Sequence, residues 1–302
     1  MRNLVVLAIL GFIAQLVDGS LGMAYGVTST TLLISIAALS PALASTVVHI
    51  SEVGTTAASG LFHWRFGNVD WGKILWLAVP GGIGAFFGAV VLVQVITAEA
   101  AEPIVAIFLF VLGGYVLARF AFNRTAEIVQ NLPIPRRFLA PLGLVAGFLD
   151  AAGGGGWGPI STPTLLSSGR MEPRKVVGTV DTSEFIVALC ASIGFLISLS
   201  FADVPWGVVG ALLAGGLIAA PLAAWFVRHL NARVLGTAVG GFILMVNANT
   251  FLDAIGVSGA PAVIVYVAIL VVWAIALFYA ISALRREREP VIEAEAARVP
   301  EA

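Results

Sequence analysis

Charged residues are scarce in this chain of 302 residues: they make up 11% of it, and the formal net charge is −1. Soluble domains carry roughly a quarter charged residues, and nucleic-acid-binding domains need a basic surface. The sequence therefore excludes a water-soluble globule and a nucleic-acid partner. Cysteine is nearly absent, because Cys190 is the single one, which excludes an intramolecular disulfide and a cysteine-based metal cluster.

Apolar residues are abundant instead, at 59% of the chain, with a mean hydropathy of +1.01. Since one membrane crossing takes about 20 apolar residues, this composition predicts an all-α integral membrane protein embedded in the lipid bilayer. Seven apolar runs are each long enough to cross. They are 41–62, 72–97, 103–121, 176–200, 205–227, 234–252 and 261–284.

Two further stretches, 4–39 and 138–169, are too long for one crossing and are interrupted by glycine-rich segments at 18–26 and 150–159. The limbs on either side have about 12–14 residues, or roughly 20 Å of helix, which is short for a hydrocarbon core of about 30 Å. Each stretch is therefore either one bent crossing or a re-entrant hairpin that returns to its starting face.

The distribution of lysine and arginine favours the hairpins. If both stretches are hairpins, 15 of the 16 basic residues fall on one face and only Arg2 falls on the other. If both stretches cross once, the count is 8 against 8. Because cytoplasmic loops carry the excess of basic residues, we expect the hairpin topology in the cell (inner) membrane, with the N-terminus outside and the C-terminus cytoplasmic.

An internal repeat appears when the sequence is shifted by 132 residues, which aligns Asp18 with Asp150 and Glu52 with Glu184. Each unit holds one hairpin and three crossings, and the odd number of crossings predicts inverted repeats, a common architecture of secondary transporters. The expected divisions are the first repeat at 1–122, a cytoplasmic linker at 123–137, the second repeat at 138–255, an extra transmembrane helix at 256–284 and a solvated cytoplasmic tail at 285–302.

The two interruptions carry related motifs. One runs through Gln15, Asp18, Tyr25 and Gly26, and the other through Gly147, Asp150, Trp157 and Gly158. This motif pair in tandem halves resembles the TauE/SafE sulfite-exporter family over roughly residues 5–285. The resemblance implies a permease for sulfite, sulfoacetate or other small organosulfur anions.

Candidate substrate-binding residues lie in and just after the interruptions. The glycines at 153–156 would let an anion approach bare N–H groups at a helix N-terminus, and hydroxyls in the next turn can donate to an oxyanion. The candidates are Gln15, Asp18, Gly22, Tyr25, Gly26, Ser29, Thr30, Asp150, Gly153, Gly154, Gly155, Gly156, Trp157, Gly158, Ser161 and Thr162. On this interpretation, leucine at Gly155 or Gly156 should block transport and leave folding intact.

Structural alternatives stay open for these residues. Glycines also allow close helix packing in membranes, and serine and threonine often bond to carbonyls of their own helix. Asp18 and Asp150 can cap the helices that follow them. Tyr25 and Trp157, which are equivalent in the repeat, can line a cavity or pack between the hairpins.

Acidic residues form a second group of candidates. Glu52 and Glu184 each follow a proline by 11 residues, which places them about 16 Å in from opposite faces. Carboxylates at such depth are candidates for function. His49 and Asp181 each lie three residues earlier, on the same helix face. We expect these four residues to carry protons, although a protonated glutamate that ties two helices together is the structural alternative.

The sequence therefore predicts a proton-coupled permease for small sulfur-containing anions that is not an enzyme and needs no cofactor or resident metal. It lacks the serine motif of an intramembrane serine protease, and its aspartates do not stand in the pattern of an aspartyl one. Two alternatives are a passive small-anion channel and a cation or metal transporter that uses the buried carboxylates. The oligomeric state is open, with a homodimer among the alternatives.

Overall fold

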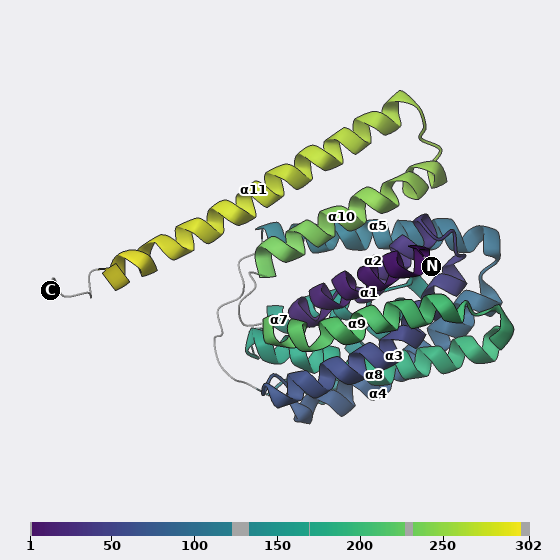
Figure 1. Cartoon of the computed structure of the whole chain (residues 1–302), viewed down its shortest axis with the longest axis horizontal. Helices are drawn as coiled ribbons and strands as arrows, with labels where there is room; N and C mark the ends of the chain where they lie inside the picture. Colours follow the sequence, from purple (N-terminus) through teal and green to yellow (C-terminus); the bar gives the residue numbers. More distant parts are fainter. Residues whose placement is uncertain (1, 123–132, 169, 227–231, 297–302) are drawn as a thin grey trace.

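The structure, a computed structural model, describes residues 2–122, 133–168, 170–226 and 232–296. Within these ranges the chain is helical and has no strand. The elements are α1 (Arg2–Leu21), α2 (Tyr25–Ser35), α3 (Pro41–Arg65), α4 (Trp71–Val90), the π-helix η1 (Val91–Val95), α5 (Ala98–Phe122), α6 (Arg136–Gly153), α7 (Trp157–Ser167), α8 (Pro173–Ser198), the 3₁₀-helix η2 (Phe201–Asp203), α9 (Trp206–Phe226), α10 (Ala232–Ala254) and α11 (Ala260–Ala296). Figure 1 shows one helical bundle with α11 at its edge, and the start of α1 and the end of α11 at opposite ends.

The prediction of an all-α membrane protein is confirmed at the level of its helices. Six of the described helices are long and apolar enough to cross a membrane by length and composition: α1, α4 with η1, α5, α8, α9 and α11. The lipid-facing character is clearest for α11, where only 11% of the apolar window is buried in the protein.

Both long stretches are interrupted where the sequence predicts. Residues 22–24 separate α1 from α2, and residues 154–156 separate α6 from α7. Gly22 has φ of 66°, and Gly154 and Gly155 have φ of 75° and 143°. Glycine adopts such positive φ angles without steric cost, so it can end one helix and start the next within three residues.

The first limb of each interrupted pair is longer than the sequence predicts. α1 has 20 residues and α6 has 18, or about 30 and 27 Å of helix, rather than 12–14 residues. Both helices continue for nearly a turn beyond Asp18 and Asp150, because the helices are interrupted at the glycines and not at the aspartates. The second limbs, α2 and α7, have 11 residues each.

α3 is more polar than the crossing helix expected at 41–62. It has 25 residues but is not among the six apolar helices, and its buried side chains include Ser45, His49, Glu52 and Thr56. It packs against α8 and α9, so protein surrounds these polar groups, as is usual for polar side chains at membrane depth. α10 is not among the six, and Gly236–Met245 is the apolar helical segment found among its described side chains.

The most extensive helix contacts join the two halves of the chain. α4 packs against α6, α1 against α9 and α5 against α10. A Cβ at Gly84 would overlap the carbonyl oxygen of Leu144, and one at Gly147 would overlap that of Gly81. Small residues let helix backbones approach this closely in membranes. The halves therefore interlock, with the fourth helix of each packed on the interrupted pair of the other.

Two segment boundaries differ from the sequence expectation. α6 begins at Arg136, inside the linker expected at 123–137, and residues 123–132 of that linker lie outside the described residues. α11 continues past Leu284 to Ala296, so the first part of the expected tail at 285–302 is helical. The last six residues, 297–302, lie outside the described part of the chain.

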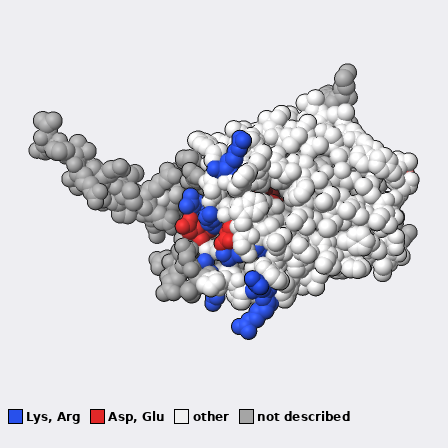
Figure 2. All heavy atoms as spheres, turned by 90° about the horizontal axis from the view of Figure 1, so that it is seen from below, with Lys and Arg blue, Asp and Glu red and all other residues white. Residues whose placement is uncertain are grey.

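Basic side chains gather at one end of the bundle. Figure 2 shows this cluster beside a largely uncharged surface. Lys73, Arg170 and Lys175 are among the residues that line a surface pocket of about 360 Å³. Three basic residues that the sequence places on the same face, Arg124, Arg228 and Arg298, lie outside the described residues.

The close contact between α4 and α6 gives a direct test of the packing. We expect Gly147→Leu to lower thermal stability or expression sharply, because the side chain would overlap the backbone of α4 at Gly81. Gly210→Leu in α9 is the matched control, since a Cβ there meets nothing within 4 Å among the described residues. Thermal denaturation in detergent, followed by size-exclusion chromatography, compares the two. Equal stability of both variants would contradict the packing.

Candidate functional site

The two interruptions meet each other inside the bundle. A Cβ at Gly26 would lie 3.1 Å from the Cα of Gly155, and one at Gly158 would lie 2.5 Å from the Cα of Met23. The Thr162 hydroxyl donates a hydrogen bond to the Gly22 carbonyl. The two interruptions thus face one another across a backbone contact that leaves no room for side chains.

Each aspartate of the repeat caps the helix that follows its interruption. The Asp150 Oδ1 accepts hydrogen bonds from the N–H groups of Gly156 and Trp157, at 2.7 and 3.0 Å. The Asp18 Oδ1 accepts one from the N–H group of Tyr25, at 3.2 Å. The capping role, which the sequence left as an alternative, is therefore present in both halves.

The N–H groups of the glycine run are bonded within the protein. The Asp150 carbonyl accepts hydrogen bonds from the N–H groups of Gly154 and, at 2.9 Å, of Gly155. The Asp150 carboxylate accepts those of the next two residues, Gly156 and Trp157. The expectation that these groups wait for an anion is therefore wrong for this conformation. A side chain at Gly155 would also overlap the backbone of Val27, so a leucine there would disturb folding and not only the path of a ligand.

His49 is paired with Asp150 rather than with Glu52. Its Nε2 lies 3.0 Å from the Asp150 Oδ2, and its Nδ1 lies 2.8 Å from the Ser45 carbonyl. A carbonyl oxygen can only accept, so Nδ1 carries a hydrogen. One further proton then lies between Nε2 and the carboxylate. The pair joins α3 to α6 and keeps its charges balanced inside the bundle.

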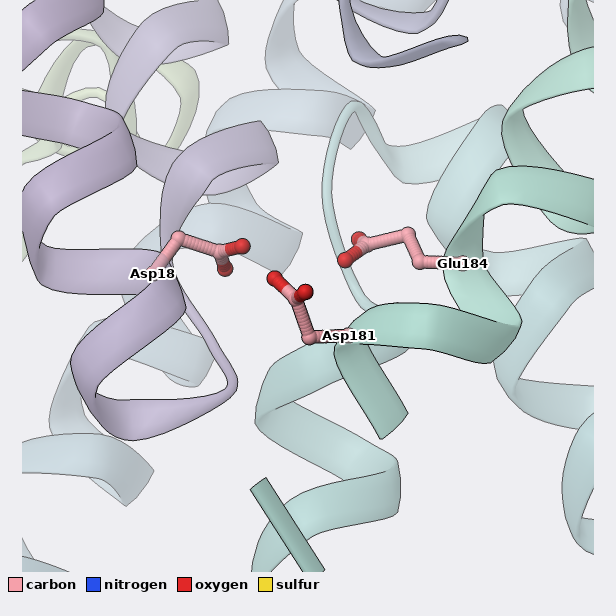
Figure 3. Close-up of side chains that lie close together, drawn as sticks. All are labelled: Asp18, Asp181 and Glu184. Atoms are coloured by element: carbon pink, nitrogen blue, oxygen red, sulfur yellow. The ribbon is translucent and has the colours of Figure 1, made fainter. Parts of the chain in front are cut away.

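Asp18, Asp181 and Glu184 form a second cluster. Asp18 comes from α1 and the other two come from α8, and the side chains turn toward one another (Figure 3). One carboxylate oxygen of each lies within 4.8 Å of the others, and all three side chains are buried. Asp181 and Glu184 thus lie close together on α8, and Asp18 joins them from the other half.

The two clusters occupy equivalent places in the repeat. The offset of 132 residues relates Asp18 to Asp150, His49 to Asp181, and Glu52 to Glu184. The first cluster is Asp18, Asp181 and Glu184, and its counterpart is Asp150, His49 and Glu52. They differ in one respect, because a histidine replaces the central aspartate in the second.

Several buried groups around the interruptions have no protein hydrogen-bond partner among the described residues. They are both oxygens of Glu52, the hydroxyls of Tyr25, Ser29, Thr30 and Ser161, and the side-chain amide of Gln15. The charged neighbours of the Tyr25 hydroxyl are Glu52, Asp18 and Glu184. Because buried polar groups in native structures are nearly always bonded, these groups mark the place where a polar ligand or water fits.

The other candidates have structural contacts. The Trp157 Nε1 donates to the Val180 carbonyl at 3.1 Å, whereas its counterpart Tyr25 keeps a free hydroxyl within the described part of the chain. A Cβ at Gly153 would meet the ring of Phe108, and one at Gly154 would meet Thr30. All the candidate residues are buried, and they separate into a packing group and a group of unbonded polar atoms.

Sequence reasoning missed three buried polar residues beside the acidic cluster. The His63 Nε2 donates to the Gly19 carbonyl at 3.1 Å, and its Nδ1 accepts from Asn68 at 3.3 Å. Ser59 is fully buried one turn before His63 on α3. The available signal was their position, since the register that places Glu52 inside the bundle continues along the same helix.

A set of apolar crossing helices around two interrupted ones, with buried carboxylates and hydroxyls where the interruptions meet, defines a multi-pass membrane transporter. A family model described as "Sulfite exporter TauE/SafE" matches residues 7–250. "Probable membrane transporter protein YtnM" of Bacillus subtilis (strain 168) is 50% identical over 283 residues, which cover 93% of this chain and 94% of that protein. No solved structure matches. The chain belongs to the TauE/SafE family of membrane transporters, as its motifs predict.

Unequal capping by the two aspartates leads to a ranked prediction. Asp150→Ala should destabilise the protein more than Asp18→Ala. The first variant leaves two backbone N–H groups and the His49 ring without their hydrogen-bond partner, whereas the second leaves one N–H group without its acceptor. A buried donor without an acceptor costs about 1–3 kcal/mol. Midpoints of thermal unfolding in the same detergent measure the order. Equal or reversed midpoints would be inconsistent with the hydrogen bonds described.

Proposed function

We propose that the protein is a secondary permease for small organosulfur or sulfur oxyanions, such as sulfite, sulfoacetate or related sulfonates, and that it couples their movement to protons. The observation that carries the proposal is the group of unbonded hydroxyls beside buried carboxylates where the two interruptions meet. The family description names sulfite export, which supports a sulfur oxyanion as the substrate class.

Hydroxyl groups are the proposed anion ligands. Tyr25, Ser29, Thr30 and Ser161 can each donate one hydrogen bond to an oxyanion, and in the described residues none of these donors is engaged with protein. None of the described lysines or arginines is buried, so no fixed positive charge would hold the anion tightly. The surface pocket at one end is lined by three basic residues, Lys73, Arg170 and Lys175, and by two acidic ones, Asp70 and Glu172. Its small positive excess would favour anions over cations at that end.

Glu52 and Glu184 are the proposed proton carriers. The charged groups that face Glu52 are His49 on its own helix, Asp150 and Asp18. Those that face Glu184 are Asp18, Glu52, Asp150 and Asp181. An anion is repelled by an ionised carboxylate but can accept a hydrogen bond from a protonated one. Binding of the anion and binding of the proton therefore favour each other.

Inverted repeats with re-entrant hairpins are the proposed architecture. Supporting this, α2 and α7 have equal lengths, and α1 packs on α9 as α6 packs on α4. The start of α1 and the end of α11 lie at opposite ends of the bundle, as an odd number of crossings requires. The long first limbs imply that α1 and α6 reach far across the bilayer before the chain turns back. A homodimer stays an untested alternative.

A cation transporter is the second candidate function, because Asp18, Asp181 and Glu184 bring three carboxylates together. A passive anion channel is the alternative that needs no titrating group. A competition assay of uptake distinguishes these functions. Added sulfite or sulfonates should inhibit uptake by an anion permease, whereas added divalent cations should inhibit uptake by a cation transporter.

Proton coupling is tested with Glu52→Gln and Glu184→Gln. A pH difference of one unit supplies about 1.4 kcal/mol per proton, so it should change the accumulation ratio of the wild-type protein about tenfold per coupled proton. We expect each glutamine variant to lose this dependence and to retain some anion exchange or leak, because glutamine still donates a hydrogen bond. The measurement is anion flux in proteoliposomes at several imposed pH gradients. Wild-type gradient dependence in both variants would support the channel instead.

Topology is tested with single cysteines in a Cys190→Ser background. We expect a cysteine at Arg170 or Arg124 to react only with a reagent on the cytoplasmic side, and one at Asp203 or Glu99 to react only from outside. The reason is the one-sided distribution of basic residues. Labelling of positions 170 and 203 from the same side would rule out the hairpin topology.

A further inference from the structure

We propose that Asp18, Asp181 and Glu184 form a sodium site within the bundle. The inference rests on the proposed permease and deepens it, because it assigns a sodium ion, as well as a proton, to residues of the proton-coupling group. Sodium binding itself does not depend on which anion is carried. Three observations support it: the spacing of the carboxylates, neutral polar groups beside them, and the lack of a buried lysine or arginine among the described residues.

The carboxylates are spaced for one ion. Their nearest oxygens lie within 4.8 Å of one another, and the side chains converge from two helices (Figure 3). A hard cation with oxygen ligands at about 2.3–2.6 Å spans oxygens up to about 4.6–5.2 Å apart. α1 ends at Leu21, three residues after Asp18, and the C-terminal end of a helix favours a cation.

Neutral oxygen ligands lie beside the carboxylates. The Ser59 hydroxyl is fully buried and directed at Asp181, and no other hydrogen-bond partner lies beside it within the described ranges. The Gln15 side chain is also fully buried, one turn before Asp18 on the same face of α1, and its amide atoms are unbonded there. Both groups lie within 3.6 Å of a Cβ placed on Gly19. The Ser59 hydroxyl supplies a neutral oxygen ligand, and the Gln15 amide would supply a second through its Oε1, although its Nε2 is the atom nearest to Gly19.

No positive side chain neutralises this cluster in the described structure. His63 is the nearest candidate, at 3.8 Å from the Asp181 Oδ2. Its Nε2 hydrogen points to the Gly19 carbonyl and its Nδ1 accepts from Asn68, so the ring is neutral. No described lysine or arginine is buried. The three carboxylates therefore need protons or a cation from solution.

A monovalent ion suits the cluster better than a divalent one. Sodium requires one ionised carboxylate, whereas a divalent ion requires two adjacent ones at a depth where each ionised group is costly. Sodium can then exchange with a proton at the same place. Unwound segments and helix C-terminal ends hold sodium in this way in secondary transporters.

The equivalent cluster lacks the site for a visible reason. His49 stands at the place of Asp181 and makes a balanced pair with Asp150. Two of the three members of the counterpart cluster therefore already balance each other, and Glu52 is the single carboxylate left. One substitution converts each cluster toward the other: His49→Asp in the equivalent cluster and Asp181→His in the proposed sodium site. This exchange makes the test specific.

The experiment measures binding of ²²Na⁺ to the purified full-length protein in detergent, without any anion substrate. We expect about one sodium per wild-type chain and one in Asp203→Asn, an exposed acidic control. Asp181→His should weaken sodium binding at least 10- to 100-fold, because loss of even a residue that only hydrogen-bonds to a metal ligand lowers metal affinity by about that factor. It should fold, because His49 shows that this place accepts a histidine beside an aspartate. His49→Asp should raise the stoichiometry toward two.

Glu184→Gln, which preserves side-chain shape, provides a second loss-of-binding variant in case Asp181→His fails to fold. Absence of sodium binding in the wild type, or unchanged binding in a folded Asp181→His or Glu184→Gln variant, would overturn the proposal. Displacement of sodium by micromolar calcium or magnesium would also overturn it in favour of a divalent site. These outcomes are independent of the anion-flux test on Glu52→Gln, so either hypothesis can fail alone.

Discussion

The constraint on which this structure depends is that lipid offers no hydrogen bonds, so every buried polar group must be satisfied by the chain itself or by what the chain binds. Asp150 shows how the constraint is met. Its carboxylate accepts from the backbone at the start of α7 and pairs with His49 of α3. One side chain thus allows a helix to end in the middle of the bundle, starts the next helix and joins it to a third.

The two halves meet the same constraint in different ways. Trp157 bonds to the backbone of α8, whereas its counterpart Tyr25 presents a free hydroxyl within the described structure. His49 balances Asp150, whereas its counterpart Asp181 stands among other carboxylates. Trp157 of the second half and His49 of the first are thus internally satisfied, whereas Tyr25 of the first half and Asp181 of the second leave polar groups for ligands. Such divergence between repeats would give a symmetric scaffold an asymmetric function.

The proposed anion and cation sites would also favour each other's occupation. Tyr25 lies among the carboxylates of Glu52, Asp18 and Glu184, so an oxyanion beside its hydroxyl would be repelled by any of them that is ionised. A proton or a sodium ion at these carboxylates removes the repulsion. Electrostatic neutrality inside a medium of low dielectric constant would thus couple the two fluxes without a buried lysine or arginine.

The sequence by itself determined the helical membrane class, the positions of the two interruptions and the family, and it shows an internal repeat at an offset of 132 residues. These follow from composition, spacing and motifs, which act locally along the chain. It could not determine the limb lengths, because Asp18 and Asp150 look like helix ends although the glycines after them set the turn. Only the tertiary structure decided that Asp150, and not Glu52, is the partner of His49, and that Asp18 joins Asp181 and Glu184. The physical reason is that these contacts connect helices far apart in the sequence, and their register depends on how glycine surfaces such as those of α4 and α6 pack.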